Sequence, residues 1–161
     1  MSDAVIHPIQ PIFNEDSRIL ILGTFPSVKS REGQFFYHHP QNRFWKVLAS
    51  ICETDVPSSI EEKKQFLLDN KIAVWDVIQS CEIVGSSDSS IRNVVPNDLS
   101  LILDHSKVKQ IFANGNKSYE LYNKYCLSVV NRDIIKLPST SPANASFSLE
   151  RLIEAWKIIV E

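Results

Sequence analysis

Two stretches of the sequence gather side chains that could bind a polar ligand or position water. The first reads Gly23-Thr-Phe-Pro-Ser27-Val-Lys-Ser30 and then Phe35-Phe-Tyr-His-His-Pro-Gln-Asn-Arg-Phe-Trp45, and the second reads Leu137-Pro-Ser-Thr-Ser-Pro-Ala-Asn-Ala-Ser146. Within the first stretch, Asn42 carries an amide that can accept a hydrogen bond from water and donate one to a ligand in the same geometry. The alternative interpretation is that Asn42 caps the helix that follows it.

The charge is distributed unevenly, although the net charge is only −2. Basic side chains outnumber acidic ones from Thr24 to Lys46 and from Ser106 to Lys136, whereas acidic side chains outnumber basic ones from Glu53 to Asp88. One interpretation is that these segments are solvated faces of an ordinary surface. The other is a polarised molecule with one face suited to binding phosphates.

Composition excludes several classes of protein. The chain has 161 residues, 43% hydrophobic and 22% charged, which predicts a single globular domain over residues 1–161. Its three cysteines lie far apart, which argues against a disulfide framework, a structural zinc site and an iron–sulfur cluster. The adjacent pair His38–His39 lacks a third ligand nearby, so we expect no metal and no cofactor. No signal peptide or membrane-length apolar run is visible, which predicts a cytoplasmic protein.

Short apolar runs alternate with segments of helical periodicity. Strands are expected at Arg18–Gly23, Ile72–Ile78, Lys109–Ala113 and Asp133–Leu137. Helices are expected at Gln41–Cys52, at Ser59–Asn70, after Asn116 and at the C-terminus, where the apolar stripe is Leu149, Leu152, Ile153, Trp156 and Val160. The segment Ser80–Asp98 is rich in Ser, Asn and Asp, so it is expected to form a long loop.

This alternation predicts an α/β fold, a three-layer α/β/α sandwich with a central, mainly parallel sheet of about four strands. Ligand sites in such sheets lie beyond the carboxyl ends of the strands. The loops that should therefore converge on one edge are Thr24–Tyr37, Asp76–Asn97, Asn114–Asn116 and Pro138–Ser146.

The two stretches quoted above resemble the two motifs of the uracil-DNA glycosylase superfamily. The block Gly23–Trp45 is similar to the mismatch-specific (G·T/G·U) glycosylases in its Gly-x-x-Pro turn and its His-Pro-x-Asn-Arg-Phe-Trp run. It especially resembles the DNA-deoxyinosine (hypoxanthine-DNA) glycosylase branch, which also carries a segment like Gly85-Ser-Ser-Asp88. The resemblance implies a uracil-DNA glycosylase-like fold. It also implies a monofunctional enzyme of base excision repair that hydrolyses the N-glycosidic bond of a deaminated base, with hypoxanthine preferred.

The resemblance assigns roles to individual residues. Asn42 is expected to be catalytic, because the deoxyinosine branch uses an asparagine at this position. Mismatch-specific relatives place their water-positioning asparagine where this chain has Phe25, so Asn42 would have to act alone. Tyr37 would stack on the flipped base. Asp76 would accept a hydrogen bond from N1–H of hypoxanthine and reject adenine, whose N1 carries a lone pair, or it would simply cap the polar loop that follows. The expected base-binding set is Gly23, Phe25, Tyr37, Asp76, Ser141 and Asn144.

DNA containing a deaminated base is the expected partner of a monomeric enzyme. Its backbone would be contacted by Ser27, Lys29, Ser30, Arg31, Ser139 and Ser146. A large apolar residue normally fills the gap left by a flipped nucleotide. The aligned residue, about Ala145, is small, so Phe147 or the first loop is the alternative. Ser146 could equally be the N-cap of the final helix.

Three other functions stay open at this point. One is a glycosylase acting on uracil, thymine or xanthine opposite guanine, and another is a DNA-binding relative that has lost catalysis. The third is a flavodoxin-like small-molecule binder, which would need the loop Gly23–Ser30 to hold a phosphate with its single glycine. No lysine lies in a context that resembles a Schiff-base nucleophile, so no lyase activity is expected.

Overall fold

Four parallel strands form the central sheet of the computed structural model, which describes residues 4–161. The strand order is β3-β2-β6-β7. The strands are β2 (Ile19–Gly23), β3 (Ile72–Asp76), β6 (Gln110–Asn114) and β7 (Ile134–Leu137). Because helices cover both faces of such a sheet, its inner strands read as continuous apolar runs. The four predicted strands and their parallel pairing are confirmed.

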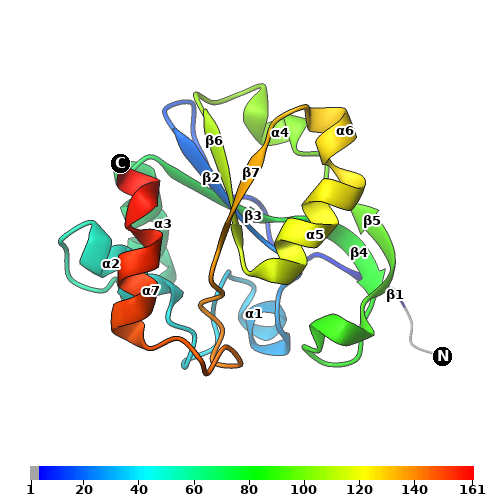
Figure 1. Cartoon of the computed structure of the whole chain (residues 1–161), viewed down its shortest axis with the longest axis horizontal. Helices are drawn as coiled ribbons and strands as arrows, with labels where there is room; N and C mark the ends of the chain where they lie inside the picture. Colours follow the sequence, from blue (N-terminus) through cyan, green and yellow to red (C-terminus); the bar gives the residue numbers. More distant parts are fainter. Residues whose placement is uncertain (1–3) are drawn as a thin grey trace.

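Helices flank this sheet on two sides. Figure 1 shows α2 (Phe44–Ile51), α3 (Ile60–Asp69) and α7 (Leu149–Trp156) to the left of the sheet and α5 (Asn116–Tyr125) to its right. The predicted three-layer sandwich is therefore confirmed. Ser148 is the N-cap of α7, accepting a hydrogen bond from the Arg151 amide, so the alternative that placed this cap at Ser146 is wrong.

A second sheet was not predicted. The segment expected to be a long loop, Ser80–Asp98, instead contains most of an antiparallel hairpin of β4 (Ile78–Glu82) and β5 (Arg92–Pro96). The strand β1 (Ala4–Ile6) pairs with β4 and completes the sheet. These strands are partly exposed and rich in polar residues, so their composition resembled that of a loop.

The expected strand Ile72–Ile78 is also divided between the two sheets. β3 ends at Asp76, and the chain turns at Val77 before β4 begins. The buried Asn97 side chain holds this turn by donating hydrogen bonds to the carbonyls of Asp76 and Ile78, at 2.9 and 3.2 Å. Apart from Asp76 this segment is apolar, and it carries no sequence signal for such a turn because the residues on both sides of Val77 are buried.

Short helices complete the chain. The helix α1 (Val28–Gly33) lies within the predicted loop after β2, and α4 (Ser100–Leu103) precedes β6. The helix α6 (Leu127–Val130) follows α5, and 3-10 turns occur at η1 (Asp88–Ser90) and η2 (Lys157–Val160). Among residues 4–161, no helix is long and apolar enough to cross a membrane.

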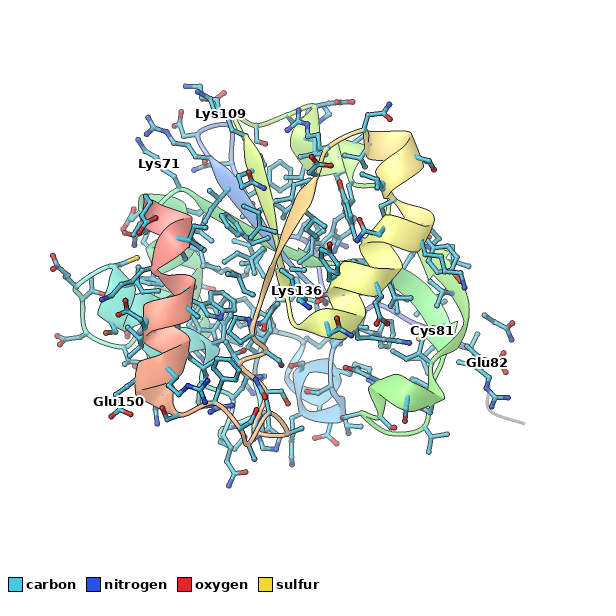
Figure 2. All side chains as sticks on the ribbon, viewed as in Figure 1. Lys71, Cys81, Glu82, Lys109, Lys136 and Glu150 are labelled. Carbon is cyan, nitrogen blue, oxygen red and sulfur yellow. The ribbon has the colours of Figure 1, made fainter. Side chains whose placement is uncertain are left out.

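A buried tryptophan in the core links α7 to the loop after β7. Side chains fill the space between the sheet and its helices (Figure 2). Trp156 on α7 is fully buried, with its ring centroid 6.0 Å from that of Phe44 on α2. Its indole N–H donates to the carbonyl of Pro138 at 2.9 Å. Trp156 therefore supports both the core and the loop that follows β7.

We expect Trp156→Ala to lower the free energy of unfolding by about 3–5 kcal/mol, because it leaves a large cavity and an unpaired carbonyl. Chemical denaturation measures this change. The control Val160→Ala removes methyl groups from a side chain that is 57% exposed in η2, and it should shift stability by no more than about 0.5 kcal/mol. Equal effects of the two substitutions would contradict this account of the core.

Candidate active site

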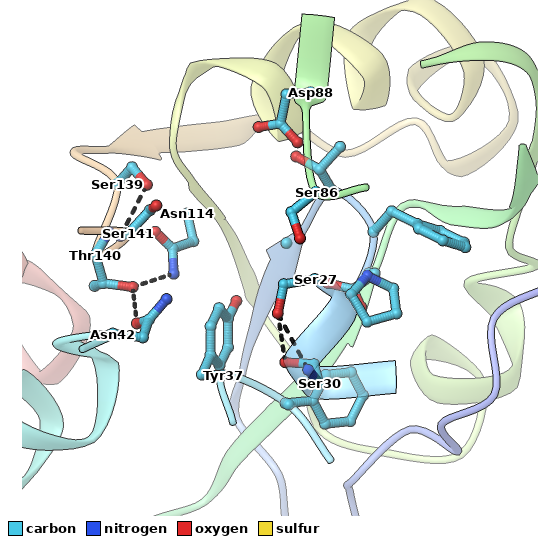
Figure 3. A pocket seen from close by; sticks show the side chains of 16 residues that line it. Ser27, Ser30, Tyr37, Asn42, Ser86, Asp88, Asn114, Ser139, Thr140 and Ser141 are labelled. Atoms are coloured by element: carbon cyan, nitrogen blue, oxygen red, sulfur yellow. Dashed lines mark hydrogen bonds between the residues drawn. The ribbon is translucent and has the colours of Figure 1, made fainter. Parts of the chain in front are cut away.

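A pocket of about 160 Å³ lies beyond the carboxyl ends of the parallel strands. All four loops that were predicted to converge contribute to it, and Figure 3 shows their side chains around one cavity. The sequence-predicted site residues that line it are Gly23, Phe25, Ser27, Ser30, Tyr37, Asn42, Asp76, Ser139 and Ser141. Further lining residues are Thr24, Pro26, Phe36, Ser86, Asp88, Asn114 and Thr140.

A chain of hydrogen bonds fixes the Asn42 amide. The buried Thr140 hydroxyl accepts from Asn114 Nδ2 at 3.0 Å and donates to Asn42 Oδ1 at 2.8 Å. Asn42 Oδ1 also accepts from the Phe44 amide at 3.0 Å. Two donors thus occupy Oδ1, so this atom must be the carbonyl oxygen, and the NH₂ group is left as the part of the amide that can serve a ligand. Asn42 both supports the start of α2 and presents donors to the pocket (Figure 3).

Tyr37 forms one wall of the pocket and is held from behind. Its ring stacks on Phe44 with centroids 3.9 Å apart, and Trp45 Nε1 donates to its carbonyl at 3.2 Å. Its φ of 50° is in the left-handed region, which is uncommon for a bulky residue and is therefore imposed by this packing. One ring face is covered by Phe44, which leaves the other for a planar ligand.

The Tyr37 hydroxyl is buried and has no hydrogen-bond partner. The Asn114 amide is close to it but outside hydrogen-bonding geometry. Burial, with the Asp76 carboxylate as the second cause, raises the pKa of this hydroxyl far above its ordinary value. The phenol therefore stays protonated and can donate a hydrogen bond to a ligand.

Asp76 lies at the floor of the pocket, paired with a histidine from the N-terminal segment. Asp76 Oδ2 is 2.7 Å from His7 Nε2, and both side chains are almost fully buried. His7 Nδ1 accepts from the Ile9 amide at 3.2 Å, so the ring proton must be on Nε2, which donates it to Asp76. A Cβ at Gly23 would come within 2.3 Å of Asp76 Oδ1, so only glycine permits this close approach.

Arg43 joins the two sequence motifs. Its backbone amide donates to the Thr140 carbonyl at 3.1 Å, and its guanidinium donates to the carbonyls of Ser141, Asn144 and Phe147. The distances to Ser141 and Asn144 are 2.7 and 3.0 Å. Charge-assisted bonds to several carbonyls are stronger than neutral ones, so this side chain determines the path of the loop after β7.

Two predicted residues of this loop are not brought into the pocket. Asn144 was expected to bind the base, but its Nδ2 donates to the Ser139 carbonyl at 3.0 Å and it lines an adjoining groove. Ser146 was expected to contact phosphate, yet its hydroxyl donates to Asn144 Oδ1 at 3.1 Å. Both side chains shape the loop, and the polar contribution to the pocket from this segment comes from Ser139, Thr140 and Ser141.

The predicted phosphate contacts on α1 have different environments. Lys29 is exposed and forms only a long ion pair with Glu32, at 3.8 Å. Ser30 is buried, and its hydroxyl accepts from the His38 amide at 3.1 Å, so a phosphate contact there is not supported. Arg31 donates to the Gly85 carbonyl at 2.5 Å and lies over the Phe25 ring. Arg31 is therefore already engaged in holding the turn between β4 and β5.

Sequence reasoning missed three functional candidates. Asn114 and Thr140 lie inside loop segments that were predicted to reach the site. For Asn114, an amide at the end of a strand and next to a glycine was a usable signal. His7 had no local signal, because its partner Asp76 is 69 residues away. No group of three side chains suited to a metal ion occurs in the part of the chain that the structure describes.

Comparisons with known proteins agree in fold and family. The uracil DNA glycosylase superfamily model matches residues 10–159. Proteins named hypoxanthine DNA glycosylase are similar to the chain. The one from Methanosarcina acetivorans is 34% identical over 92% of this chain and 93% of its own, and the one from Methanosarcina barkeri is 35% identical over 68% of this chain and 71% of its own. The solution NMR structure of a candidate uracil DNA glycosylase from Methanosarcina acetivorans superposes with a TM-score of 0.81, at 32% identity, over 96% of each chain.

We expect Arg43→Ala to lower the free energy of unfolding by at least about 2 kcal/mol, because it leaves several carbonyls without their charged donor. Hydrogen exchange should show faster exchange of amides in residues 139–147. The control Arg18→Ala removes an exposed side chain at the opposite end of β2 and should leave this exchange unchanged. Unaltered exchange in Arg43→Ala would show that the loop is held by other contacts.

The pairing of His7 with Asp76 predicts non-additive stability changes. His7→Ala and Asp76→Ala each leave one partner buried and unpaired, whereas the double substitution removes both. We therefore expect a coupling free energy of about 0.5–3 kcal/mol in a double-mutant cycle measured by urea unfolding. Additive effects would mean that the hydrogen bond contributes little to the folded state.

Proposed function

The chain belongs to the uracil DNA glycosylase superfamily, and we propose that this DNA glycosylase releases hypoxanthine from deoxyinosine in DNA. Similarity to proteins named hypoxanthine DNA glycosylase over most of the chain supports this substrate. The observation that carries the proposal is the acceptor at the pocket floor. Asp76 is held by the neutral His7 ring and keeps Oδ1 for a ligand.

Recognition of the base follows from the donors and acceptors of the pocket. Hypoxanthine has a donor at N1–H and an acceptor at O6, so Asp76 accepts from N1–H. Adenine places a lone pair at N1, which the carboxylate repels. The protonated Tyr37 hydroxyl lies on the same floor and can donate to an acceptor of the base. The free face of the Tyr37 ring stacks on the base after it has left the duplex.

Asn42 acts on the leaving base in this proposal. Breaking the bond from C1′ to N9 leaves negative charge on the purine, and donors aimed at that charge lower the barrier. Asn42 presents its NH₂ group to the pocket, so it donates to the departing purine. The expectation that the same amide also accepts from water is modified, because its oxygen already accepts two hydrogen bonds.

DNA is the partner of this enzyme, and its backbone has several candidate contacts in and around the pocket. Lys29 is exposed on α1 and its long ion pair with Glu32 leaves it able to contact phosphate, and Ser27 and Ser139 lie at the pocket wall. We further propose that residues 1–161 act as one monomeric domain in the cytoplasm. The free thiols of Cys52, Cys81 and Cys126 are consistent with a reducing compartment.

A base-release assay tests the substrate. We expect labelled duplexes that carry hypoxanthine to yield alkali-sensitive abasic sites, with much less product from duplexes that carry uracil, thymine or xanthine. Uracil also has an N–H group that could donate a hydrogen bond to Asp76, so this comparison decides between hypoxanthine and uracil as the substrate. Predominant uracil or thymine release would assign a mismatch-specific activity. Binding without release of any base would assign a DNA-binding relative.

The same assay tests Asn42. We expect Asn42→Ala to slow release by about 100- to 1,000-fold at saturating enzyme, because one donor to the developing charge is lost. Binding of the duplex should change only a few-fold. The control Asn123→Ala alters an exposed amide on α5 and should retain full activity. A fully active Asn42→Ala enzyme would remove Asn42 from the mechanism.

A further inference from the structure

The proposed reaction needs a group that positions the attacking water, and Asn42 is unable to supply it. Its Oδ1 already accepts from Thr140 and from the Phe44 amide, so no lone pair of that oxygen remains for water. A carboxylate is an effective acceptor for a water proton. Within residues 4–161, the carboxylates that line the pocket are those of Asp76 and Asp88.

Asp76 is in the wrong place for this role. It is 4% exposed at the pocket floor, Oδ2 binds His7, and Oδ1 packs over Gly23. With N1–H of hypoxanthine on Asp76, the purine extends away from the floor, because N1 and N9 are at opposite ends of its ring system. N9 and the attached sugar carbon must therefore lie toward the mouth of the pocket.

Asp88 is at that mouth. It begins the turn η1 between β4 and β5, and it lines both the base pocket and the adjoining groove beside Lys117 and Ser139. Figure 3 shows it across the pocket from Asn42, next to Ser86. Two hydrogen bonds hold this turn against α1: Val28 N–H donates to Ser86 Oγ at 2.9 Å, and Arg31 donates to the Gly85 carbonyl.

The electrostatic surroundings of Asp88 suit a base. Partial burial of its carboxylate raises the pKa, the Lys117 ammonium on α5 opposes this change, and the Asp76 carboxylate on β3 adds to it. A carboxylate with a raised pKa binds a proton more readily than an ordinary surface aspartate.

We propose that Asp88 positions and deprotonates the water that attacks C1′ of the flipped nucleotide, an inference that rests on the proposed glycosylase activity. The water oxygen forms a bond to C1′ as the bond from C1′ to N9 breaks. The electron pair of that bond leaves with the purine, whose negative charge is stabilised by the Asn42 NH₂ group. The water proton moves to Asp88, which later returns it to solvent, and the purine takes a proton from solvent.

Single-turnover release of hypoxanthine by Asp88→Asn tests this proposal. The substitution keeps the shape of the side chain and removes its basicity, so we expect a loss of at least about 100-fold in rate. Binding of the hypoxanthine duplex, measured by fluorescence anisotropy, should change less than about three-fold. The matched control Asp133→Asn alters an exposed carboxylate at the opposite end of the sheet and should be fully active.

The pH profile separates catalysis from support of the turn. The wild-type rate should fall at low pH as Asp88 becomes protonated, and Asp88→Asn should lack this decrease in its residual rate. Ser86→Ala, which loosens the turn but keeps the carboxylate, should retain the decrease. Thermal melting confirms that each variant is folded.

Two results would overturn the role of Asp88: a rate of Asp88→Asn within three-fold of wild type, or a rate loss matched by an equal loss of DNA binding. Failure of the proposed function is distinguished by the wild-type enzyme. If the wild type releases a base other than hypoxanthine, the substrate proposal fails, and the same variants are compared on that base. If the wild type releases no base at all, both proposals fail.

Discussion

The Thr140 hydroxyl sets the chemistry that the pocket can perform. It accepts from Asn114 and donates to Asn42, and it is fully buried, so no water competes for either hydrogen bond. This arrangement decides which end of the Asn42 amide reaches the pocket. An amide that was free to rotate would present donor or acceptor in turn, whereas this one presents its NH₂ group. In the mechanism that we propose, the amide therefore serves the leaving purine and a separate carboxylate serves the water.

Much of the architecture could be predicted because its signals are local. Apolar runs such as Arg18–Gly23 and the stripe along α7 depend on neighbouring residues only, and the parallel order of the sheet follows from their alternation with helices. The location of the site followed from the same rule, since loops at the carboxyl ends of parallel strands meet. Asn42, Tyr37 and Asp76 were named from the resemblance to the glycosylase motifs before their geometry was known, and their roles are still proposals.

The features of the fold and the site that were not predicted depend on contacts between distant segments, and such contacts leave no local sequence pattern. His7 pairs with Asp76 across 69 residues, and Arg43 contacts carbonyls about a hundred residues later. Nothing in the sequence indicated that the Asn144 side chain would form its hydrogen bond within its own loop. The residue type alone does not show whether an asparagine side chain points into a pocket or back toward the loop. The hairpin of β4 and β5 was hidden for a related reason: strands that are half-solvated carry the polar composition of loops.

Arg43 contacts the loop after β7 through main-chain oxygens alone. Every amino acid supplies such an oxygen, so the shape of the loop does not depend on which side chains are present at its tip. Pro142, Ala143 and Ala145 are exposed there. These positions can be exchanged without altering the backbone that presents them, so the exposed surface of this loop can diversify by point substitution while the hydrogen bonds beneath it stay constant.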